Sequence, residues 1–179
     1  RTPEASEAWR LNIESGKISA PIPAAHQPGT RVEIRDLFYT TPARLKFLKT
    51  ERTEFSRVEE VIKRLAMAHP NIGFSLSNGE RRRLDLMPNQ SDLAVARINR
   101  LENIMGRDFV KNALSIEAER DGFKVTGHVS LPTFNRSNAS LQFLFVNGRP
   151  VSDRILFGAV RGAYRDFIAS GRHPVLALF

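Results

Sequence analysis

The stretch Ser140–Val146 carries apolar residues at nearly every position, and it limits the possible folds of this chain more than any other segment. A strand with one face in water alternates apolar and polar residues, whereas so apolar a run is typical of a strand inside a sheet. The tight-turn pair Asn147-Gly148 follows it directly. We therefore expect Ser140–Val146 to be a central strand.

The rest of the second half supplies the other parts of such a sheet. Strands are predicted over residues 114–118, 123–131 and 174–179, and a helix capped by Ser91 or Asp92 should end at Gly106. A last helix, capped by Ser152, should end near Gly171. Its buried stripe is expected to be Ile155, Ala159, Ala163 and Phe167. The pattern predicts an α/β sandwich with helices on one face.

The first half alternates extended and helical patterns. Thr30–Arg35 alternates polar and apolar residues, which predicts a half-buried strand with Val32 and Ile34 facing inward. A helix should begin between Thr50 and Thr53 and end before His69-Pro70. Its expected buried stripe is Phe55, Val58, Ile62 and Leu65. A hairpin over 72–87 follows, and Pro88-Asn89-Gln90 is the predicted domain boundary.

The chain is basic, with 27 Lys and Arg against 19 Asp and Glu and a net charge of +8. Each half carries +4, so the charge is not a basic tail. This balance favours polyanionic partners such as nucleic acid, while a cationic surface without a partner remains an alternative. Cysteine is absent and no apolar run is long enough for a membrane helix, which fits an intracellular, cytoplasmic protein.

Two groups of cations are candidates for binding phosphates. In the last helix Arg154, Arg161 and Arg165 share one face, and Arg154 near free helix N–H groups would favour a phosphate there. A solvated charged face is the competing interpretation. The second group surrounds the segment Asp36–Leu48 and the helix after it. Its members are Arg44, Lys46, Lys49, Arg57 and Arg64.

Motifs for catalysis are missing from the chain. No phosphate-binding loop, nucleotide fingerprint or serine-nucleophile motif occurs, and the four histidines are too scattered in sequence to predict a metal site. The chain starts without Met and ends on an apolar run, so we expect a fragment of a longer protein. No catalytic residue is predicted in it.

Three sequence blocks match a known family in order and spacing. They are Gly29–Ile34, then Asp36–Leu48 with the sequence DLFYTTPARLKFL, and later Phe145–Val151 with the sequence FVNGRPV. Together they strongly resemble the MutL family of DNA mismatch repair proteins, and the likeness runs from about Trp9 to Phe179. The family usually has Asn where Thr40 stands, but Thr can still bond the neighbouring backbone and preserve the turn.

This resemblance implies an α+β fold in two parts. Residues 1–88 would be the C-terminal part of a GHKL-type ATPase α/β sandwich, and residues 91–179 a ribosomal protein S5 domain 2-like α/β sandwich, truncated at its C-terminus. The parent would bind ATP and Mg²⁺ and dimerise on binding ATP. That dimerisation would couple a mismatch-recognition protein to downstream repair enzymes, with DNA in a basic groove between protomers.

The resemblance also implies roles for particular residues. Gly29 and Thr30 would lie near the nucleotide phosphates, but the rest of the family's ATP site lies upstream. We therefore expect no bound cofactor and no ATP hydrolysis by this chain alone. The residues expected to contact DNA are Arg44, Lys46, Lys49, Arg64, Arg149, Arg154 and Arg161. The alternative is a stand-alone nucleic-acid-binding α/β module; a type II topoisomerase subunit is disfavoured by the Pro42–Phe47 block.

Overall fold

The structure is a computed structural model that describes all residues from Arg1 to Phe179. The chain divides into two compact units, Arg1–Thr50 and Glu51–Phe179. The domain boundary predicted from the sequence is at residues 88–90 instead. In the structure, the helix and hairpin between residues 51 and 88 form one unit with the residues that follow. The assignment of residues 1–88 to the end of an ATPase domain stays a prediction.

The first unit holds two small antiparallel sheets. Strand β1 (Ala8–Arg10) pairs with β4 (Ile22–Ala24), and β2 (Ile13–Glu14) pairs with β3 (Lys17–Ile18). The predicted strand over Thr30–Arg35 does not form, and Val32 and Ile34 are 79% and 75% exposed. An alternating sequence becomes a strand only where another strand completes its hydrogen bonds, and this unit provides none for residues 30–35.

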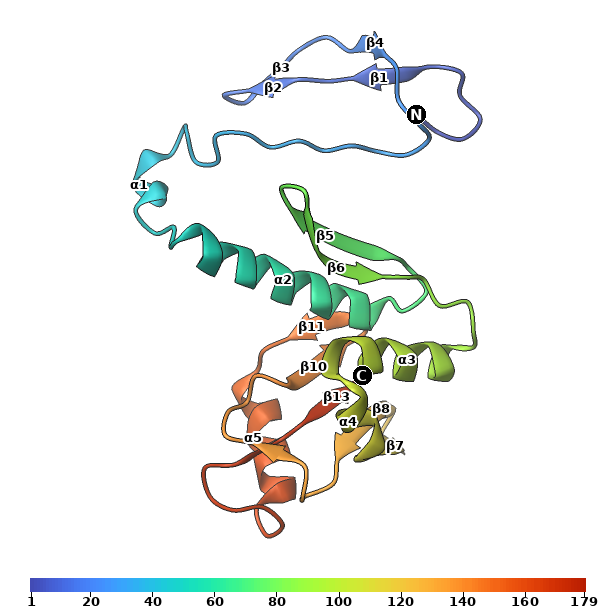
Figure 1. Ribbon diagram of the computed structural model, residues 1–179, viewed down its shortest axis with the longest axis vertical. Coiled ribbons are helices and arrows are strands. Elements are labelled where there is room, and N and C mark those ends of the chain that lie inside the picture. The colour runs from blue at the N-terminus through green and yellow to red at the C-terminus, as the bar shows by residue number, and fades with distance from the viewer. The chain divides into compact units, whose positions relative to one another are not determined.

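The second unit is built on a five-stranded mixed sheet with the order β11-β10-β13-β8-β7 (Figure 1). The strands are β7 (Ala113–Arg120), β8 (Phe123–Ser130), β10 (Gln142–Val146), β11 (Arg149–Val151) and β13 (Leu176–Leu178). Only β10 and β13 pair in parallel. The predicted apolar strand is β10, which has a neighbour on each side, so its internal position is confirmed.

Shorter elements complete this unit. Helix α2 (Glu51–Ala68) has the predicted bounds and is followed by the hairpin β5 (Phe74–Asn78) and β6 (Arg81–Leu86). Helix α3 (Leu93–Met105) is capped by Asp92, and α4 (Arg107–Lys111) comes after Gly106. Strand β9 (Asn135–Arg136) pairs with β12 (His173–Pro174), and α5 (Arg154–Tyr164) crosses between the parallel strands.

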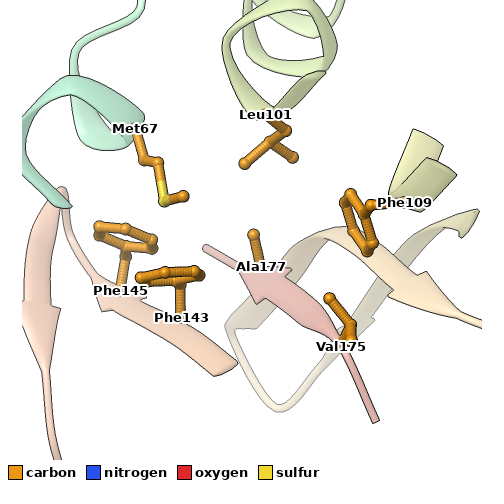
Figure 2. Packing of buried hydrophobic residues seen from close by; sticks show 7 residues of the cluster. All are labelled: Met67, Leu101, Phe109, Phe143, Phe145, Val175 and Ala177. Carbon is orange, nitrogen blue, oxygen red and sulfur yellow. The ribbon is translucent and has the colours of Figure 1, made fainter. Parts of the chain in front are cut away.

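Helices cover both faces of the sheet, so the prediction of helices on one face is wrong. Met67 of α2, Leu101 of α3 and Phe109 of α4 pack on one face, as Figure 2 shows. The strand residues they meet are Phe143, Phe145, Val175 and Ala177. On the other face, Val160 of α5 packs against Leu144 and Leu176. Consecutive buried apolar residues in β10, from Phe143 to Phe145, require two covered faces.

The buried side of α5 also differs from the predicted one. Phe157, Val160 and Tyr164 face the sheet, and the Tyr164 hydroxyl donates a 2.6 Å hydrogen bond to the Ser130 carbonyl. The predicted stripe points to solvent instead, with Ile155 81% and Phe167 69% exposed. The helix carries two apolar stripes, and the buried one contains Phe157 and Tyr164, whose hydroxyl reaches a backbone carbonyl.

Candidate nucleic-acid interface

Helix α5 begins with a carboxylate at its N-terminus. Asp153, rather than the predicted Ser152, is the N-cap, and its Oδ1 accepts hydrogen bonds from the backbone N–H groups of Ile155 and Leu156 at 2.8 and 3.0 Å. The negative charge also satisfies the helix dipole there. A phosphate at this helix end would meet an anion and occupied donors, so the predicted anion site at the N-terminus is wrong.

The arginines on the flank of α5 remain available. Arg154, Arg161 and Arg165 recur at intervals of seven and four, which places them on one side of the helix, and all three are exposed. No salt bridge of the structure involves them. We call these three residues the arginine ridge. Uncompensated exposed guanidinium groups in a row are suited to contact successive phosphates.

Arg149 lies close to the ridge in sequence but on a different element. It is the first residue of β11, an edge strand of the sheet, where it pairs with Val146 of β10 and is exposed. The turn before it contains Asn147 and Gly148 with φ of 49° and 76°, a conformation that favours this residue pair. The same turn therefore connects the apolar strand β10 to the basic end of β11.

The outward side of α5 carries mostly small side chains or none. Gly158 and Gly162 have open space around the position of a Cβ atom, and neither has a positive φ. Alanine would therefore fit at both positions, and each glycine costs about 1 kcal/mol of helix stability relative to alanine. Packing inside the unit gives no reason for these two glycines.

The predicted DNA-contacting cations of the first unit lie in and directly after a one-turn helix. Helix α1 (Pro42–Leu45) starts with proline at its first position, and the Arg44 guanidinium lies 6.0 Å from the centre of the Phe38 ring. Lys46 and Lys49 follow and are exposed. Phe38 has a φ of 70° and belongs to a turn rather than to the strand end that its sequence suggested.

Arg64 and Arg57 have partners within α2. Arg64 donates to Glu60 at 2.6 Å and its guanidinium lies 5.0 Å from the centre of the Phe143 ring, with 23% of its side chain exposed. Arg57 lies 3.4 Å from Glu54. The predicted i,i+4 pair of Lys63 with Glu59 also forms, at 2.6 Å. Arg64 therefore joins α2 to the sheet. Because it is paired with Glu60, it is not one of the exposed cations that lack a carboxylate partner.

Two further arginines, which the sequence did not single out, belong to the interior. Arg100 of α3 is 2% exposed, and its Nη2 lies within 2.9 Å of the carbonyl oxygens of Pro70, Ile72 and Met87. Arg97 lies 4.3 Å from the ring centre of Phe179. Burial lowers the pKa of both guanidinium groups. The only sequence signal is their position near the buried Leu101 of α3. Arg97 lies four residues before it and Arg100 lies one residue before it.

Gly29 and Thr30, which are expected to lie near the nucleotide phosphates, belong to the first unit. Gly29 has a φ of 127°, which only glycine adopts readily, and no atom lies within 4 Å of its Cβ position. Its N–H donates to the Arg1 carbonyl at 2.9 Å, and Thr30 is exposed. The backbone at Gly29 is thus open to a close neighbour. No group of three or more His, Cys, Asp or Glu side chains that could hold a metal ion is present.

Comparisons with known proteins place this fold and sequence in a family. The family model described as "DNA mismatch repair protein, C-terminal domain" matches residues 101–179. MutL of Paramagnetospirillum magneticum is 55% identical over 175 residues, which cover 98% of this chain. MutL of Rhodospirillum rubrum is 55% identical over 179 residues, which cover all of it. The chain belongs to the MutL family of DNA mismatch repair proteins.

The chain is only part of a MutL-length protein. It spans 29% of the first of these relatives and 28% of the second. A solved structure of the Aquifex aeolicus MutL ATPase domain complexed with ADP is 26% identical, with a TM-score of 0.68, and the match covers 96% of this chain and 60% of that one. The MutL resemblance and the α+β fold class are therefore confirmed. No helix of the structure is long and apolar enough to cross a membrane.

Proposed function

We propose that this chain is the part of a MutL-type mismatch repair protein that presents a DNA-binding surface on its second unit. The observation that carries the proposal is the arginine ridge, three exposed guanidinium groups on one flank of α5 without a carboxylate partner. Arg149, exposed on the edge strand β11 that precedes α5 in the chain, is proposed as a further DNA contact of this unit. Arg44, Lys46 and Lys49 are proposed as further DNA contacts of the first unit, and Arg64, which is paired and stacked, as a weaker one.

The contacts are proposed to be with DNA phosphates rather than bases. Guanidinium groups in a row neutralise phosphates of any sequence, and each contact steepens the dependence of binding on salt. Trp9, Tyr39 and Tyr164 do not form a platform for stacking bases, since Tyr164 packs on the sheet through its bond to Ser130. Binding should therefore depend strongly on ionic strength and little on sequence.

The ATP-dependent steps belong to the parent protein in this proposal. ATP with Mg²⁺ would drive dimerisation, which would couple a mismatch-recognition protein to downstream repair enzymes. Within this chain Gly29 and Thr30 would lie against the phosphates, where the open backbone at Gly29 allows a close approach. The similar Aquifex aeolicus MutL ATPase domain was solved as a complex with ADP, which supports nucleotide binding by the parent protein. The lengths of the MutL relatives favour it over a stand-alone nucleic-acid-binding module.

The DNA proposal is tested by the salt dependence of binding. Fluorescence anisotropy of a labelled 20-base-pair duplex is measured with residues 1–179 between about 50 and 200 mM NaCl. Arg154→Glu should weaken binding of two unrelated duplexes equally and reduce the slope of log affinity against log salt by about one. Arg120→Glu is the control: Arg120 is also exposed but lies on β7, the opposite edge strand. An unchanged slope for Arg154→Glu would show that Arg154 does not contact DNA.

The nucleotide proposal has a separate test. Phosphate release from ATP and Mg²⁺ is measured for residues 1–179 and for the parent protein, each with Thr30 intact and as Thr30→Ala. The expected result is no release above the blank for residues 1–179 and a reduced rate for the substituted parent. Turnover by residues 1–179 would contradict the assignment of the catalytic groups to upstream residues.

A further inference from the structure

The outward face of α5 has no packing partner and carries no polar side chain. Ile155 is 81% exposed, and Gly158, Ala159, Gly162 and Ala163 are exposed beside it. At 3.6 residues per turn, the two glycines lie between Ile155 and the arginine ridge. The open face is thus bordered along its length by cations that have no counter-ion in this structure.

The positive charge on this border indicates what kind of partner can bind the open face. Three arginines without acidic partners repel a second copy of the same face and attract a polyanion. They span about 16 Å along the helix axis, over which one strand of duplex DNA presents about five phosphates. The carboxylate of Asp153 already accepts from the backbone N–H groups of Ile155 and Leu156, so a phosphate would bind the guanidinium groups of the ridge rather than these donors. A DNA strand is therefore directed along the flank of α5.

We infer that α5 lies lengthwise against the sugar–phosphate backbone of duplex DNA, and that Gly158 and Gly162 set how closely the two approach. This inference rests on the proposed function and adds the geometry of the contact. A larger side chain at either position would separate the helix from the DNA backbone. The glycines instead allow the helix main chain to contact the deoxyribose surface. The guanidinium groups of the ridge then reach phosphates directly instead of through water.

Uncharged substitutions at the two glycines test the inference. Gly158→Ala/Gly162→Ala should raise the melting temperature by about 5 °C, because alanine favours the helix and both Cβ positions are open. The same variant should weaken duplex binding severalfold. Gly158→Leu/Gly162→Leu should weaken it about tenfold or more, as ridge contacts are lost. Ala169→Leu, which also places a leucine at an exposed position but beyond α5, is the control.

The outcomes separate this inference from the proposed function. If Arg154→Glu lowers the salt slope while the leucine variant binds like the unsubstituted chain, the ridge contacts DNA but the outward face does not, and the inference is overturned. If neither variant changes binding, both proposals fail. Unchanged DNA binding together with lost self-association of the leucine variant in sedimentation would assign the face to a second copy of the chain. Weaker binding by a more stable alanine variant supports the close approach.

Discussion

Replacing Arg100 by methionine removes the cation that joins α3 to the two ends of the β5–β6 hairpin. The three carbonyl oxygens of Pro70, Ile72 and Met87 share the two hydrogens of Nη2, so the bond set counts as about two hydrogen bonds from a charged donor. At about 1.5 to 3 kcal/mol each, they contribute about 3 to 6 kcal/mol. Arg100→Met also removes a buried positive charge that has no carboxylate partner, and the desolvation cost saved in this way offsets part of the loss. We expect a net loss of about 3 kcal/mol.

Urea unfolding monitored by circular dichroism measures this loss. With a slope of about 2 kcal/mol per molar urea, the midpoint should fall by about 1.5 M. Arg120→Met, at an exposed position beside Asp121, is the control and should shift the midpoint little. Hydrogen exchange should accelerate first between residues 69 and 88. An Arg100→Met midpoint equal to that of the unsubstituted chain would refute the view that this arginine stabilises the unit.

Three further predictions concern the sheet and the cations packed on it. Gly127→Ala should prevent stable folding, because a Cβ atom there would lie 2.1 Å from the Ala177 carbonyl oxygen and the φ is 144°; a native melting curve would disprove this. Burial lowers the pKa of His128, so the unfolded chain binds more protons below about pH 6.5. The free energy of unfolding should therefore fall as the pH drops through that range, and His128→Gln should flatten the titration. Arg64→Gln should lower stability by about 1 kcal/mol through lost contacts with Glu60 and Phe143. Its effect on the DNA salt slope, compared with that of Arg154→Glu, measures how much Arg64 contributes to binding.

Local sequence patterns were sufficient where the required partners lie close along the chain. The hairpin β7–β8 turns at Asp121-Gly122, whose φ values of 51° and 78° follow from the preference of these residues for left-handed conformations. Helix α2 ends at Ala68 because Pro70 cannot continue it. Asp92 caps α3 through hydrogen bonds to Ala94 and Val95. Each of these features depends on interactions within a few residues.

Patterns whose structure depends on a distant partner do not predict the fold by themselves. Thr30–Arg35 has the alternation of a strand but no strand to pair with, so its apolar side chains remain exposed. Helix α5 has two apolar stripes, and its periodicity cannot tell which one meets the sheet. The position of Ser130, whose carbonyl accepts the Tyr164 hydroxyl, decides it.

The candidate site illustrates the same division. The spacing of Arg154, Arg161 and Arg165 determined by itself that they share one side of a helix, because that depends only on helical geometry. Which arginines remain on the surface was decided by tertiary structure. Arg100 lies in the interior because carbonyl oxygens from two distant segments converge on it, and Arg64 stacks on a phenylalanine of β10. Sequence determines charge and local shape, whereas the packing of distant segments determines which charges are free to meet a partner.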